Sequence, residues 1–105
     1  MKITIQSIHF DAADHLKAYI QKKCDKLDQF YDRIVDGEVI LKLHNDIKGG
    51  NKFVEVKMNV PGDTLLATET GQTFEEAIDL TTDKIKEQLR RYKGKTKGRV
   101  RASGS

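Results

Sequence analysis

The side chains of this chain that could do chemistry are mostly lysines and arginines, and they gather near its C-terminal end. Residues 84–105 carry nine Lys or Arg and one acid, a net charge of +8, whereas residues 1–83 carry ten Lys or Arg and fifteen acids, a net charge of −5. Ammonium and guanidinium groups bind phosphate oxygens without reading base sequence. The segregation therefore predicts a surface for a polyanion such as RNA.

The alternative explanation for the clustered cations is a helix end that is only solvated and binds no partner. Acids early and bases late in a helix are what the helix dipole favours, but that effect acts over about the first and last turn. It does not require nine cations, nor their continuation past the end of the helix. We therefore favour the polyanion-binding surface.

No catalytic group, metal or cofactor is predicted, and the chain is not expected to be an enzyme or to take a small-molecule substrate. The three histidines, His9, His15 and His44, show no metal-ligand spacing to one another or to Cys24. Cys24 lies on an apolar helical stripe, where a buried and inert thiol is expected. No Gly-rich loop followed by Lys and Ser/Thr is present to cradle a phosphate.

The cations are positioned by a predicted helix that begins after Thr73. The spacing of Thr73 and Glu76 is typical of a capping box. An apolar stripe then recurs at steps of three and four, at Phe74, Ile78, Thr81, Ile85, Leu89 and Tyr92. On the helical wheel one shoulder of this stripe holds Lys84, Arg91 and Lys95, and the other holds Lys86, Arg90, Lys93 and Lys97. Only one shoulder can face a neighbouring helix.

An earlier helix is predicted from Asp11, as the N-cap residue, to about Tyr31. Three lysines three and four residues apart lie together on one shoulder of its stripe. They can join the later cations in one RNA-binding surface, whose candidate residues are Lys22, Lys23, Lys26, Lys84, Lys86, Arg90, Arg91, Lys93 and Lys95. Tyr19 and Tyr92 are either base-stacking rings or part of the core and its rim. Leu80, which points away from the stripe, is either a partner contact or a tolerated surface leucine.

Alternation of apolar and polar residues predicts strands over 2–7, 38–43, 52–60 and 64–70. Residues 46–51 are expected to form a turn, and Val60-Pro61-Gly62-Asp63 fits a type II turn. The fold class is therefore α+β, with the order β-α-β-β-β-α and a four-stranded mixed sheet. The first two strands are expected to be parallel, joined by a right-handed crossover, and both helices should cover one face of the sheet.

The length of 105 residues suits one domain, which we place at residues 1–93 and follow with a basic flexible tail at 94–105. A single cysteine excludes an internal disulfide and favours a reducing cytoplasm. No apolar run approaches the ~20 residues of a membrane span, and the N-terminal residues do not resemble a secretory signal. We expect a monomer with no membrane partner.

Two segments resemble a known family. Residues 23–34, KCDKLDQFYDRI, resemble the end of the first helix in the ribosome hibernation-promoting factor and ribosome-associated inhibitor family, also called the sigma-54 modulation protein family. The second-helix signature of that family is similar to EAID at 76–79, DKI at 83–85 and QLRRYK at 88–93. The resemblance covers about residues 1–95, although Glu75 stands where the family has an aromatic residue. The chain looks like the short form, without a C-terminal dimerisation domain.

The resemblance implies the same β-α-β-β-β-α fold, which is similar to double-stranded-RNA-binding domains. It implies binding in the decoding channel of the small ribosomal subunit and repression of translation when growth stops. The RNA contacts of the family carry over to Lys23, Lys26, Lys84, Arg91, Lys93 and Lys95, while Lys22, Lys86 and Arg90 rest on the surface argument alone. Two alternatives stay open: a protein-binding regulator that modulates a sigma factor, and a general binder of double-stranded RNA.

Overall fold

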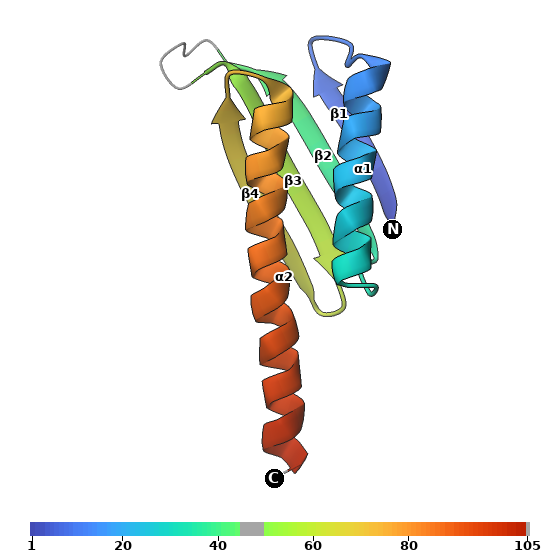
Figure 1. Cartoon of the computed structure of the whole chain (residues 1–105), viewed down its shortest axis with the longest axis vertical. Coiled ribbons are helices and arrows are strands. Elements are labelled where there is room, and N and C mark those ends of the chain that lie inside the picture. The colour runs from blue at the N-terminus through green and yellow to red at the C-terminus, as the bar shows by residue number, and fades with distance from the viewer. Residues whose placement is uncertain (45–49, 105) are drawn as a thin grey trace.

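The computed structural model describes residues 1–44 and 50–104, with side chains for 1–44 and 50–94. Six elements follow one another: β1 (Lys2–Ile8), α1 (Asp14–Phe30), β2 (Asp36–Leu43), β3 (Lys52–Val60), β4 (Asp63–Gly71) and α2 (Phe74–Gly104). Figure 1 shows the two helices side by side over the strands. The predicted α+β class and β-α-β-β-β-α order are confirmed.

The four strands form one sheet in the order β1-β2-β3-β4. β1 pairs with β2 in parallel, and the other two pairs are antiparallel, as predicted. The β3–β4 hairpin closes at the pair Val60 and Asp63, which leaves Pro61 and Gly62 as a two-residue turn. Gly62 has φ 79°, the positive value that the predicted turn requires at that position.

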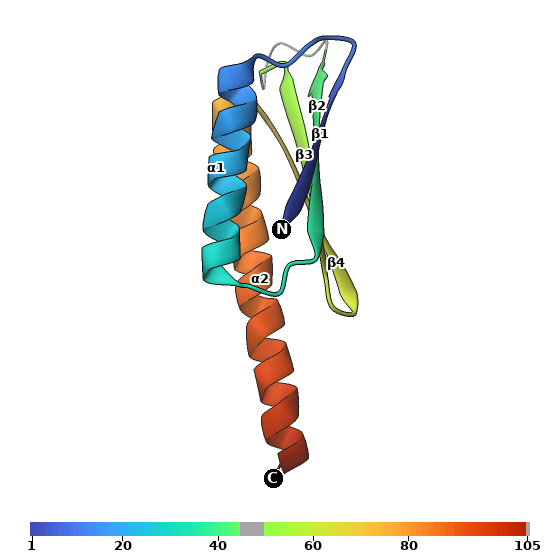
Figure 2. The same cartoon turned by 90° about the vertical axis from the view of Figure 1, so that its right-hand side faces the viewer.

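Both helices cover the same face of the sheet, as the side view in Figure 2 shows. α2 packs on β3 and β4, and α1 lies against α2 on the β1 side. The core is formed by the apolar stripes of the helices and by the alternating inward residues of the strands, and its largest fully buried side chains include Ile20, Leu41, Met58, Ile78, Ile85 and Leu89. The apolar stripes of the two helices thus pack on the sheet, and the polar residues of the helices lie on the opposite side.

The start of α1 corrects the sequence prediction. The sequence predicts Asp11 as the N-cap residue, but α1 begins at Asp14 with Ala13 at the N-cap position and no side-chain cap. Phe10 stacks on Phe74 with ring centroids 5.2 Å apart, and Ala12 is buried. Because these contacts hold residues 10–12 across the end of the core, the chain turns into the helix only after them.

α2 continues to Gly104, through most of the segment that the sequence analysis places in a basic tail, and it projects beyond the sheet (Figure 1). Lys and Arg are good helix formers and no proline interrupts them. The division into a domain at 1–93 and a flexible tail at 94–105 stays a prediction, since side chains after Gly94 are outside the described part of the chain. The predicted turn at 46–51 likewise falls largely on residues 45–49, outside the described residues.

No helix in the described part of the chain combines the length and the apolar character that crossing a membrane demands.

Candidate nucleic-acid interface

Tertiary packing determines which shoulder of α2 faces α1. The ammonium groups of Lys86 and Lys93 lie 5.3 Å and 4.5 Å from the ring centroid of Phe30, the last residue of α1. Lys93 also donates a hydrogen bond of 3.1 Å to the Phe30 carbonyl. A cation at this place satisfies a free carbonyl of the helix end and its negative dipole. The Lys86/Lys93 shoulder is therefore the one against α1, and Lys93 has a structural role there.

A groove between the two helices brings together cations that are far apart in the sequence. Its lining comes from the second half of α1 and the first half of α2 and consists of Lys23, Lys26, Leu27, Thr82, Asp83 and Lys86. Lys26 and Lys86 are exposed, and Lys22 is exposed beside them on the outer side of α1. The predicted joining of first-helix lysines with second-helix cations thus exists, with Lys86 as the member from α2. We name the three lysines that line it, Lys23, Lys26 and Lys86, the groove cations.

The other shoulder of α2 lies over β4, away from α1. Lys84 forms an ion pair with Glu69 and donates a hydrogen bond of 3.4 Å to the Thr68 carbonyl. One turn further on, the Gln88 amide donates to the Leu66 carbonyl at 2.8 Å. These side chains occupy the free edge of β4, where unpaired carbonyls would otherwise face solvent.

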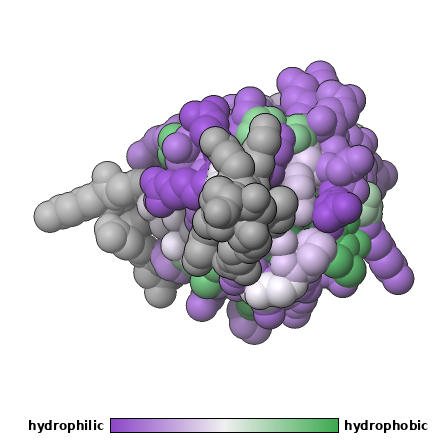
Figure 3. Space-filling view, turned by 90° about the horizontal axis from the view of Figure 1, so that it is seen from below, coloured by the Kyte–Doolittle hydropathy of each residue, from purple (hydrophilic) through white to green (hydrophobic). Residues whose placement is uncertain are grey.

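Arg91 continues this shoulder and lines a hollow with Asp63, Leu65, Gln88 and Tyr92. Arg90 is exposed and pairs with Glu87 on its own helix at 3.1 Å. The side chain of Lys95 is outside the described part of the chain. The predicted cations are therefore divided between two sides of α2. Seen from the end where α2 projects, the surface is mostly hydrophilic, with smaller apolar areas (Figure 3).

Asp79 of α2 ties the two helices together. One of its oxygens accepts a hydrogen bond of 2.6 Å from the Tyr19 hydroxyl and lies 3.1 Å from the Lys23 ammonium. The hydrogen bond to Asp79 raises the pKa of Tyr19 to about 12, because losing the phenolic proton would place two negative charges together. The same bond, helped by Lys23, lowers the pKa of Asp79. Asp79 thus stays ionised between the helices.

Both tyrosines that could have stacked on a base have partners within the domain. Tyr19 is bonded to Asp79. Tyr92 donates to the Pro61 carbonyl, and its ring meets Tyr31 edge-on at 5.7 Å. These contacts favour the alternative in which the two rings belong to the core and its rim. Leu80 points away from the stripe, as expected, and is 41% exposed.

The environment of Cys24 disfavours a role as a nucleophile. Cys24 is buried, and burial raises the pKa of its thiol to about 12, so the nucleophilic thiolate is scarce at neutral pH. Within residues 1–44 and 50–104, no group of three or more His, Cys, Asp or Glu side chains is arranged to hold a metal ion.

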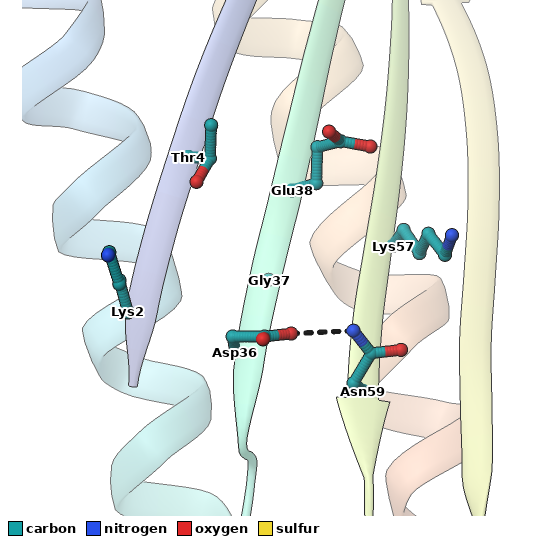
Figure 4. Close-up of a pocket in the computed structure, with 7 residues that line it drawn as sticks. All are labelled: Lys2, Thr4, Asp36, Gly37, Glu38, Lys57 and Asn59. Carbon is teal, nitrogen blue, oxygen red and sulfur yellow. Dashed lines mark hydrogen bonds between the residues drawn. The ribbon is translucent and has the colours of Figure 1, made fainter.

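A second hollow lies on the open face of the sheet, opposite the helices. Figure 4 shows Lys2 on β1, Asp36 and Glu38 on β2, and Lys57 and Asn59 on β3. The Asn59 amide donates a hydrogen bond of 2.6 Å to Asp36. Two acids and two lysines share this hollow, so no single charge dominates it. It is a weaker candidate for a polyanion than the helical layer.

Sequence reasoning missed the acids that hold the cations. The Glu87–Arg90 pair could have been found, because residues three apart on a helix are neighbours. Asp79 and Glu69 could not, because their partners lie on other elements and sequence spacing carries no signal for such pairs.

The fold and the site define a small α+β domain whose helical layer carries clustered cations over a four-stranded sheet. Residues 3–97 match the family described as sigma 54 modulation protein / S30EA ribosomal protein, and the chain belongs to this family. The family expected from the two helix motifs is thereby confirmed.

Curated relatives agree with this family. The chain is 32% identical over 85 residues to the ribosome hibernation promotion factor of Deinococcus radiodurans, covering 79% of this chain and 44% of that protein. It is 31% identical over 109 residues to the factor of Bacillus subtilis, covering 100% and 55%. The chain therefore spans about half the length of these two relatives. Against the ribosome hibernation promoting factor of Azotobacter vinelandii it is 28% identical over 90% of this chain and 85% of the other.

Two solved structures share the fold. A ribosomal subunit interface protein from Coxiella burnetii superposes with a TM-score of 0.81 at 23% identity, covering 90% of this chain and 99% of that one. The N-terminal domain of Thermus thermophilus Protein Y gives a TM-score of 0.76 at 24% identity, covering 88% and 99%. Both likenesses support the architecture of one sheet with two helices on one face.

Proposed function

We propose that this protein is a ribosome hibernation factor that binds RNA of the small ribosomal subunit through its helical layer, in the decoding channel, and represses translation in stationary phase or stress. The observation that carries this proposal is the groove between α1 and α2, where Lys23, Lys26 and Lys86 converge from two helices. Family membership and relatives named ribosome hibernation promotion factors support it.

The interface binds RNA phosphates through the charge and the position of its lysine and arginine side chains. Lysine is a compact point charge that meets one phosphate oxygen at a time, while arginine can form two parallel hydrogen bonds. Lys23, Lys26 and Lys86 line the groove between the helices, whereas Arg91 lines a separate hollow on the β4 side of α2. Such a domain recognises a shaped RNA site that offers phosphates on both sides of one helix. A protein of this kind works in the cytoplasm as a monomer and needs no cofactor.

The test is co-sedimentation of the purified chain with small ribosomal subunits across a salt series, with large subunits and a plain RNA duplex as controls. We expect saturable binding to small subunits that weakens steeply with salt, since each phosphate contact releases counterions with a slope of about −0.7 to −0.9. Equal binding to all three targets would reduce the protein to a general RNA binder. No binding at low salt would contradict an RNA-binding role.

A second candidate function is modulation of a sigma factor, because the description of the matching family includes it. A protein partner would give binding that depends weakly on salt and survives removal of RNA. Binding of a purified sigma factor at the same salt concentrations discriminates the two functions.

A further inference from the structure

Several cations of the proposed interface are already held by acids of the same domain. Lys23 pairs with Asp79 between the helices, and Lys84 pairs with Glu69 across the gap between α2 and β4. Arg90 pairs with Glu87 on its own helix. Within the described side chains, the remaining candidate cations are in no ion pair, and these are Lys22, Lys26, Lys86, Arg91 and Lys93. The interface therefore contains two kinds of cation, paired and unpaired.

The carboxylate of Asp79 is fixed in place. Its Oδ1 atom accepts a hydrogen bond of 2.6 Å from the Tyr19 hydroxyl and lies 3.1 Å from the Lys23 ammonium. Its side chain is nevertheless 45% exposed, so its negative charge is felt at the surface between the helices. The lowered pKa keeps it ionised at neutral pH. A phosphate that approaches Lys23 meets this carboxylate, which cannot turn away without losing the Tyr19 hydrogen bond.

Glu69 is fixed in a different way. It stands on β4, whose residues 63–71 are paired with β3 along their whole length. Lys84 reaches it from α2 while also donating to the Thr68 carbonyl at 3.4 Å. The Lys84 ammonium is thus directed toward the sheet edge, where a carboxylate on a fully paired strand offsets its charge.

We propose that Asp79 and Glu69 are specificity residues, which compete with RNA phosphates for Lys23 and Lys84 and so limit the affinity of the domain for RNA in general. This inference rests on the proposed function. A plain duplex presents phosphates at regular spacing and would contact all the cations within its reach, including Lys23 and Lys84. Its phosphates are therefore repelled by the carboxylates of Asp79 and Glu69. A shaped target that relies on the unpaired cations avoids most of this repulsion and keeps its affinity.

The test compares two double variants with the same change in net charge. Asp79→Asn with Glu69→Gln removes the competing charges. The control, Glu38→Gln with Glu55→Gln, removes two acids of the open face, where Glu38 on β2 lies opposite Lys57 and Glu55 on β3 lies opposite Ile40. Dissociation constants are measured for a plain RNA duplex and for small ribosomal subunits at several salt concentrations. An asparagine oxygen can still accept the Tyr19 hydrogen bond, and melting temperatures confirm that both variants fold.

We expect the Asp79/Glu69 variant to bind the duplex about three- to tenfold more tightly, because exposed ion pairs and repulsions at this distance are each weak. Its salt slope should steepen by about 0.7 to 0.9 for each additional phosphate that the variant binds. Its affinity for small subunits should rise less, and the open-face control should change duplex binding by less than about twofold.

An unchanged duplex affinity would overturn the inference. An equal rise in both double variants would also overturn it, because net charge alone would then explain the effect, as would an equal rise for duplex and subunits. The proposed function fails if the wild-type chain does not bind small subunits. The competition by the two acids would still stand in that case, provided that the Asp79/Glu69 variant, and not the open-face control, binds the duplex more tightly than the wild type.

Discussion

The two faces of this domain differ in how acidic residues are placed around their lysines. On the open face of the sheet, the strand register sets Lys2 opposite Asp36 and Glu38 opposite Lys57. On the helical face, lysines from two helices line one groove whose only acidic lining residue in the described part of the chain is Asp83, and Asp79 pairs with one of these lysines, Lys23. A polyanion surface therefore depends on how the fold distributes charge, and not on how many lysines a face carries.

The cause lies in the geometry of the two element types. Neighbouring strands place residues directly opposite one another, where opposite charges stabilise and like charges repel. A helix places residues three and four apart on one shoulder, so like charges can follow one another along the axis. α2 uses this freedom with acids in its first turns and cations later.

The largest effect should come from reversing the exposed lysines in and beside the groove. Lys22→Glu, Lys26→Glu and Lys86→Glu together should weaken binding to small ribosomal subunits by about a hundredfold or more, because three phosphate contacts become three repulsions. These residues are exposed, so melting temperature should change little. The measurement is co-sedimentation at fixed salt.

The matched control reverses three exposed lysines of the sheet, Lys2→Glu, Lys42→Glu and Lys57→Glu, with the same change in net charge. Binding should fall far less than in the groove variant. If both variants lose binding equally, the two faces do not differ in function and the groove is not the interface.

Truncation after Lys93 should have the next largest effect on binding. It removes four cations that follow Lys93 in the sequence, Lys95, Lys97, Arg99 and Arg101. Subunit binding should weaken about tenfold at physiological salt, with a shallower salt slope. Thermal unfolding by circular dichroism checks the fold, and a large drop in melting temperature would show that the segment is part of the structural domain.

Lys93→Ala should act on stability more than on RNA binding. It removes the hydrogen bond to the Phe30 carbonyl and the contact with the Phe30 ring. Together these contribute about 1 kcal/mol. Chemical denaturation should show that loss, whereas the neighbouring exposed Lys86→Ala should lose more binding and less stability. A binding defect without a stability loss would place Lys93 among the RNA contacts.

The smallest effect is expected from Tyr19→Phe, about 0.5 to 1.5 kcal/mol of unfolding free energy. The raised pKa of Tyr19 means that its contribution is present below about pH 10 and is lost as the pH rises toward 12. The lowered pKa of Asp79 means that the same contact weakens as the pH falls below about 4. Wild type should therefore exceed the variant between these limits, measured by urea denaturation across pH. A constant difference at all pH values would contradict the Tyr19–Asp79 contact.

Much of the fold could be predicted from local patterns. The alternation over Lys52–Val60 correctly predicts the bounds of β3, and the Pro61-Gly62 pair correctly places the turn. The Thr73 hydroxyl accepts from the Glu76 N–H at 3.1 Å, as its spacing predicts. The start of α1 could not be predicted, because the Phe10–Phe74 contact joins residues distant in sequence.

The order of the elements, the two apolar stripes and the concentration of cations after residue 83 all follow from the amino-acid sequence. Those features depend on propensity, periodicity and composition, which act between residues close along the chain. Tertiary packing was needed to settle which shoulder of α2 meets α1, and hence that Lys86 joins Lys23 and Lys26 while Lys84 turns to Glu69. That choice depends on how two helices pack on one sheet, and packing is set by contacts between residues far apart in the chain.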